Sequence, residues 1–171
     1  MLRWGLIPSW AKDPKMGMHC INAKAETVAE RPSFRSAFKK RRCLVIADGF
    51  YEWQRHGGRK QPMWIGRTDR RPFAFAGLWE HWQPSAGDPI ESCTIITTEP
   101  NDLMAPIHNR MPVILDRTAY DQWLDPTFQQ TELLKPLLRP YPSEELTAYP
   151  VSILVNNPRH DVPQCLESVP V

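Results

Sequence analysis

The chain has 171 residues, a length that predicts a single domain over residues 1–171 and leaves no room for two full ones. Hydrophobic residues at 42% and charged residues at 23% are ordinary globular values, which exclude a fibrous repeat and a largely disordered chain. The formal net charge of +2 is too small to indicate a nucleic-acid partner by itself.

The compartment is predicted from what the sequence lacks. No apolar run approaches the roughly 18 residues of a membrane span, and the first residues do not show a secretory signal pattern. The four cysteines have no CxxC spacing and no partnered histidines, which argues against a zinc site. We therefore expect a reduced, cytoplasmic protein without disulfides, a metal, another cofactor or a membrane partner.

The predicted elements are short, because 18 prolines are scattered singly along the chain. In chain order we expect a strand at 3–7, an extended piece at 18–23, and helices at 26–30 and 33–40. Strands follow at 43–47, 50–53, 61–66, 72–79, 91–98 and 112–115. The end of the chain predicts helices at 117–124 and 128–138 and a last strand at 151–155. This order predicts an α+β fold with a mostly antiparallel, curled or barrel-like sheet flanked by short helices.

Three polar residues stand where a plain core element would not need them. Asn22 lies among small residues, so its amide could face a cleft, although a turn asparagine is equally compatible with the segment. Glu52 is flanked by Tyr51 and Trp53, and loss of solvation would raise its pKa and suit it to acid/base chemistry. The alternative is a glutamate on the solvent face of the strand.

The third polar residue is His108, in a loop between Pro106 and Pro112. A histidine can move protons near neutral pH, and Arg110 beside it can hold a phosphate or carboxylate; the alternative is a surface histidine. Two basic runs, residues 35–42 and 67–71, are compatible with solvated helix ends or turns. The residues alone therefore predict an Asn/Glu/His polar cleft with basic flanks.

Six longer segments occur in one order along nearly the whole chain. They are RWGLIPSW (3–10), INAKAET (21–27), RRCLVIADGFYEW (41–53), TIITTEPN (94–101), IHNRMPVIL (107–115) and VNNP (155–158). Together they resemble the SRAP family (SOS response-associated peptidase). The resemblance implies a DNA-damage function in which single-stranded DNA is bound and abasic sites are captured, with the protein nucleoid-associated when on DNA.

The family chemistry uses an N-terminal cysteine exposed by removal of the initiator methionine, an autopeptidase step. Its amine forms an imine with the ring-opened sugar aldehyde, and its thiolate closes a thiazolidine; the same amine can cut by β-elimination. The resemblance assigns catalysis to Asn22 (positioning), Glu52 (acid/base) and His108 (proton transfer).

The same resemblance implies that Lys24 and Arg110 bind DNA phosphates and that Trp10 supports the unstacked DNA. One departure is plain: the family begins with Met-Cys-Gly-Arg and some tens of residues before the Arg-Trp-Gly-Leu segment, with which this chain begins. We expect the chain as given to lack the nucleophile and to be inactive in crosslinking. Cys20 has no free α-amine and is expected to be a strand residue.

Two other function classes remain open at this point. One is a non-catalytic single-stranded-DNA-binding repair module, which would bind DNA in a salt-dependent way without a covalent step. The other is a general peptidase, for which the residues present show no GxSxG elbow or comparable serine turn.

Overall fold

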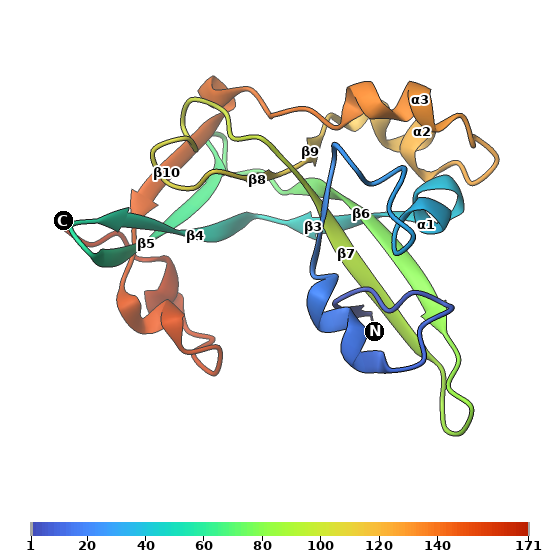
Figure 1. Ribbon diagram of the computed structural model, residues 1–171. Coiled ribbons are helices and arrows are strands. Elements are labelled where there is room, and N and C mark those ends of the chain that lie inside the picture. Colours follow the sequence, from blue (N-terminus) through green and yellow to red (C-terminus); the bar gives the residue numbers. More distant parts are fainter. Residues whose placement is uncertain (1, 171) are drawn as a thin grey trace. The chain divides into compact units, whose positions relative to one another are not determined.

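The computed structural model describes residues 2–170 and groups them into two compact units, each with its own sheet (Figure 1). The first unit comprises the described residues up to Ile46, Ala74–Thr98 and Pro112–Pro140. The second comprises Ala47–Phe73, Glu99–Met111 and the described residues from Tyr141 onward.

The sheet of the first unit is built around a long antiparallel hairpin, β6 and β7, which lie side by side in Figure 1. Its strands are β1 (Arg3–Trp4), β2 (Asn22–Lys24), β3 (Arg42–Ala47), β6 (Phe73–Trp82), β7 (Ile90–Thr98) and β9 (Ile114–Leu115), with β8 (Met111–Pro112) at the boundary between the units in the sequence. The main order is β1-β7-β6-β3; β9 pairs with β6, and β1 and β2 both run parallel to β7.

Short helices cover this sheet with apolar side chains. The α-helices are α1 (Arg35–Lys40), α2 (Tyr120–Leu124) and α3 (Thr131–Leu134). Phe38 of α1, Trp123 of α2 and Leu134 of α3 are all fully buried in one cluster with Leu78 and Ile96 of the β6–β7 hairpin. Burial of this face stabilises the unit, since a helix of four to six residues is not stable alone.

Arg42 joins two helix ends to the start of β3. The side chain is buried, and its guanidinium donates to the carbonyls of Phe38 (2.8 Å) and Lys39 (2.7 Å) at the end of α1. It also donates to the backbone carbonyl of Trp123 (2.6 Å) at the end of α2. The remaining contacts, in the turn beyond α2, are the carbonyls of Asp125 and Phe128. Helix C-terminal carbonyls lack partners within their helix, so one cation satisfies carbonyls of both ends.

Replacing Arg42 with Met is expected to lower the free energy of unfolding by about 3–4 kcal/mol, because several buried carbonyls would lose their donor. Arg42→Lys should recover only part, since an ammonium has three donors and no planar fork. Chemical denaturation followed by circular dichroism measures both. Exposed Arg35→Met is the control, and a loss of under about 1 kcal/mol for Arg42→Met would contradict this account.

The second unit contains a three-stranded antiparallel sheet in the order β10-β5-β4. Its strands are β4 (Gly49–His56), β5 (Arg59–Arg67) and β10 (Leu146–Pro150). The turn between β4 and β5 is Gly57–Gly58, both at positive φ, the conformation that a tight hairpin turn requires. In the register of this sheet Glu52 pairs with Met63, and the next pair is Tyr51 with Trp64.

The expected fold class is confirmed, since most strands pair antiparallel and the helices are short, but neither sheet is closed into a barrel. Short 3-10 helices supply much of the remaining structure: η1 (Pro14–His19), η2 (Arg117–Ala119), η3 (Lys135–Leu137), η4 (Ser143–Glu145), η5 (Ile153–Asn156) and η6 (Pro163–Leu166). The helix expected at 26–30 is a series of turns, and the last strand is β10, before the expected 151–155. No helix among the described residues is long and apolar enough to cross a membrane.

Candidate functional site

Glu52 and His108 meet in the second unit. Glu52 lies in the middle of β4, and His108 lies in the loop of residues 99–110. The Nδ1 atom of His108 is 3.8 Å from Oε1 of Glu52, an ion-pair distance when the imidazole is protonated. The Glu52 side chain is 25% exposed and that of His108 is 41% exposed, so both remain within reach of a substrate.

The Glu52 carboxyl has a raised pKa. Burial among its neighbours disfavours the charged form and is the largest cause, while the nearby His108 and the backbone N–H of Trp53 act in the opposite direction. A carboxyl whose pKa lies above its ordinary value can both donate and accept a proton closer to neutral pH. This is the property that the aromatic flanks of Glu52 predict.

His108 is held by the backbone two residues further along the chain. Its Nδ1 lies 3.1 Å from the amide nitrogen of Arg110, which donates to a neutral ring, and 3.0 Å from the carbonyl oxygen of Arg110. A protonated Nδ1 would donate to that carbonyl instead. The ring therefore has a backbone partner in either protonation state, which suits a group that gains and loses a proton.

The loop that carries His108 is fastened to β4 by Gln54. The side-chain amide of Gln54 donates to the carbonyl of Pro106 over 3.1 Å. Gln54 and Glu52 are two residues apart in a strand, so they share a face. The one signal for Gln54 in the sequence is its alternation with Glu52.

Two asparagines make hydrogen bonds elsewhere in the second unit, away from the contact between Glu52 and His108. Asn101 accepts from the amide of Met104 (2.9 Å) and donates to the carbonyl of Tyr141 (2.7 Å), which shapes the start of the His108 loop. Asn156, from the VNNP segment, accepts from the indole of Trp53 over 2.7 Å. These contacts give both asparagines a structural role.

Asn22, Lys24 and Trp10 lie in the first unit. Asn22 and Lys24 are both exposed on one face of β2, while Ala23 between them is buried. The Trp10 side chain is also exposed, at 56%, and its indole donates to the carbonyl of Pro32 over 3.3 Å. The predicted residues therefore divide between the units, with Glu52, His108 and Arg110 in the second.

Cys20 is a core residue. It is 4% exposed and caps the end of η1, immediately before the residues that lead into β2, where a strand residue was expected. Burial raises the pKa of its thiol, so the unreactive protonated form dominates at neutral pH. Residues 2–170 contain no group of three or more histidines, cysteines and carboxylates placed to hold a metal ion.

Comparisons with known proteins identify the family. The profile of SOS response associated peptidase (SRAP) matches residues 1–158, and the chain belongs to this family. The abasic site processing protein YoqW of Bacillus subtilis is 50% identical over 168 residues, which cover 98% of this chain and 75% of YoqW. The abasic site processing protein HMCES of Xenopus tropicalis is 38% identical, over 98% of this chain and 56% of HMCES. A crystal structure of a protein from Bacteroides thetaiotaomicron is similar with a TM-score of 0.90 and 32% identity, covering 98% of this chain and 75% of that one.

Glu52→Gln is expected to stabilise the protein at pH 7.5 more than at pH 4. The pKa of Glu52 is higher in the folded state than its ordinary value of 4.5, which applies to the unfolded chain. The wild type therefore loses stability as the pH rises from about 4.5 through the folded-state pKa, whereas the amide of glutamine does not titrate and loses none. Thermal unfolding at both pH values measures the difference in Tm. The exposed Glu91→Gln is the control; an equal Tm difference for Glu52→Gln at both pH values would contradict the raised pKa.

Gln54→Leu is expected to loosen the His108 loop without unfolding the sheet. Losing one hydrogen bond of about 1 kcal/mol should speed hydrogen exchange of the amides at 107–110 about fivefold. Exchange followed by mass spectrometry measures this, with Gln83→Leu as the control, because Gln83 also bonds a backbone carbonyl but lies in the first unit. Unchanged exchange at 107–110 would show that Gln54 does not hold the loop.

Proposed function

We propose that this chain processes abasic sites in single-stranded DNA as part of a DNA-damage response. The observation that carries the proposal is the contact between Glu52 and His108 in a chain of the SRAP family. Two relatives that match nearly the whole of this chain bear the name abasic site processing protein. A half-buried carboxyl of raised pKa beside an imidazole is suited to the proton transfers that abasic-site chemistry needs.

In the proposed reaction Glu52 protonates the ring oxygen of the abasic sugar while the anomeric hydroxyl gives up its proton to water, so that the C–O bond of the ring breaks and the aldehyde forms. The α-amine of an N-terminal cysteine then attacks the aldehyde carbon, and loss of water gives an imine. The cysteine thiolate adds to the imine carbon, and the nitrogen takes up a proton as the thiazolidine closes. His108 moves protons on the sugar side, and Asn22 positions the sugar.

The proposed DNA contacts are electrostatic and aromatic. Lys24 and Arg110 would hold phosphates, and the exposed Trp10 ring would support an unstacked base. The nucleophile is proposed for a chain that carries Cys-Gly-Arg at its processed N-terminus, since Cys20 is buried and lacks a free α-amine.

The test compares this chain with a version extended at its start to carry that cysteine. Each is incubated with single-stranded DNA bearing one abasic site and run on a denaturing gel. Only the extended version is expected to give a heat-stable shifted band, while the short chain should bind DNA in a salt-dependent way. A band with the short chain would assign the nucleophile to an internal residue and overturn the proposed mechanism.

Glu52→Gln in the extended version is expected to slow crosslinking about a hundredfold while leaving DNA affinity unchanged. The exposed Glu91→Gln serves as the control. An unchanged crosslinking rate would remove Glu52 from the chemistry. Salt-dependent binding with no crosslink in any version would favour a non-catalytic single-strand-binding module.

A further inference from the structure

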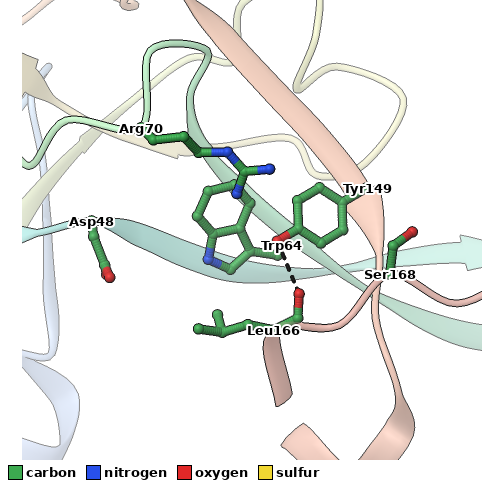
Figure 2. A pocket seen from close by; sticks show the side chains of 6 residues that line it. All are labelled: Asp48, Trp64, Arg70, Tyr149, Leu166 and Ser168. Atoms are coloured by element: carbon green, nitrogen blue, oxygen red, sulfur yellow. Dashed lines mark hydrogen bonds between the residues drawn. The ribbon is translucent and has the colours of Figure 1, made fainter. Parts of the chain in front are cut away.

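A cavity of about 600 Å³ lies in the second unit, a volume typical of small-molecule sites (Figure 2). Its lining combines aromatic rings, one cation, one anion and a hydroxyl. The lining residues are Asp48, Trp64, Arg70, Tyr149, Leu166 and Ser168.

The strand register places this cavity on the face of the sheet opposite Glu52. Trp64 pairs with Tyr51 on one side and Tyr149 on the other, so the rings of all three residues belong to one face. Glu52 is one residue beyond Tyr51 and therefore belongs to the other face. The cavity is separate from the Glu52–His108 pair.

Two glycines paired across β4 and β5 leave space for the indole of Trp64. Gly49 and Gly66 are opposite each other in the sheet, and a Cβ at either would lie 2.4 Å or 2.2 Å from the indole of Trp64. The indole is buried as a result, with the Tyr149 ring 5.0 Å away at 31°. The Tyr149 hydroxyl donates to the carbonyl of Leu166 over 3.0 Å, which fixes the half-exposed ring at the cavity.

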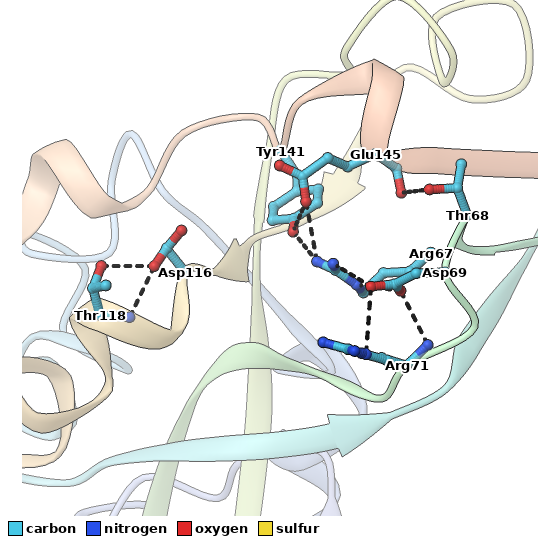
Figure 3. Close-up of polar contacts among 8 residues, drawn as sticks. All are labelled: Arg67, Thr68, Asp69, Arg71, Asp116, Thr118, Tyr141 and Glu145. Atoms are coloured by element: carbon cyan, nitrogen blue, oxygen red, sulfur yellow. Dashed lines mark hydrogen bonds and ion pairs between the residues drawn. The ribbon is translucent and has the colours of Figure 1, made fainter.

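Arg70 differs from the other arginines of the 67–71 run. Arg67 is bound to Asp69 at 2.8 Å, and Arg71 approaches the same carboxylate at 3.9 Å (Figure 3). The Arg70 guanidinium instead lies over Trp64 at 5.2 Å and over Tyr149 at 5.7 Å. Across residues 2–170 it has no hydrogen-bond or ion-pair partner.

The backbone of Arg70 is also unusual. Its φ of 60° lies in the left-handed region, which costs a non-glycine residue free energy and is concentrated at functional sites. This conformation accompanies a side chain that is directed over the aromatic rings. A guanidinium whose face is stacked keeps its N–H edge available for an anion such as phosphate or carboxylate.

We propose that this cavity binds a nucleotide unit, with its phosphate on the N–H edge of Arg70 and its base against the Tyr149 ring. The Asp48 carboxylate accepts from an amino group of the base, and the Ser168 hydroxyl is a further polar partner. The unit is either a free nucleoside monophosphate or one residue of a single strand. This inference goes beyond the proposed function and requires no abasic-site chemistry.

Other ligand classes fit the lining less well. An apolar ligand would leave the edge of Arg70 and the Asp48 carboxylate without partners on desolvation. A metal cation would meet one carboxylate and the positive charge of Arg70. A nucleotide uses the cation, the anion and the ring together.

The test follows the seven tryptophan indole N–H signals by NMR in ¹⁵N-labelled protein. The probes are deoxyguanosine monophosphate, deoxyguanosine without phosphate, and an undamaged single strand rich in guanine. We expect a saturable shift of the Trp64 signal with the monophosphate, the strand or both, and at least tenfold weaker binding of the nucleoside. Binding of the strand alone would identify a DNA subsite, and binding of the monophosphate would identify a free-nucleotide site.

Arg70→Gly removes the side chain, and glycine readily adopts the positive φ at this position, so the fold is retained. The affinity measured from the Trp64 signal should fall at least tenfold. The neighbouring Arg71→Ala, whose side chain is 78% exposed, is the control. No Trp64 shift with any probe up to roughly 5 mM, or equal binding of nucleoside and monophosphate, would overturn the proposal. Glu52→Gln should leave the shift unchanged, which separates this result from the crosslinking test.

Discussion

The alternation of side chains across the β10-β5-β4 sheet is the constraint on which both sites of the second unit depend. It assigns Glu52 to one face and Trp64 to the other, and the Gly57–Gly58 turn fixes the pairing that does so. A slip of β4 by one residue against β5 would move the carboxyl to the face of the Trp64 indole, away from the His108 loop. One hairpin therefore defines two different chemical environments.

Burial disfavours the charged form of both Arg42 and Glu52, lowering the pKa of the guanidinium and raising that of the carboxyl, but the two groups differ in their hydrogen-bond partners. Arg42 is enclosed by five backbone carbonyls, which compensate its lost hydration and make it a structural residue. Glu52 receives one backbone N–H and lies 3.8 Å from an imidazole, so its charge is incompletely compensated and its pKa rises. Incomplete compensation is what makes a group useful for proton transfer.

Local patterns predicted much of the fold and part of the site. The apolar run at 43–47 and the aromatic flanks of Glu52 identified β3 and a carboxyl of raised pKa, because strand-forming residues and apolar neighbours are visible locally, although the run itself is only partly buried and Ile46 is exposed. The contact of Gln54 with Pro106 joins residues 52 apart, and no local pattern reports such a pairing. The last strand was misplaced because the apolar run at 151–155 is partly exposed at Ile153 and Leu154, whereas the less apolar β10 pairs with β5.

The contacts of Arg42 depend on a side chain for the donors but only on the main chain for the acceptors. Its partners are main-chain carbonyls, which every amino acid supplies, so a change of the exposed Lys39 side chain leaves its acceptor in place. The donor side has no such freedom, because arginine alone offers a planar fork with five N–H groups. The information that joins two helix ends to a strand is thus held at a single position of the chain.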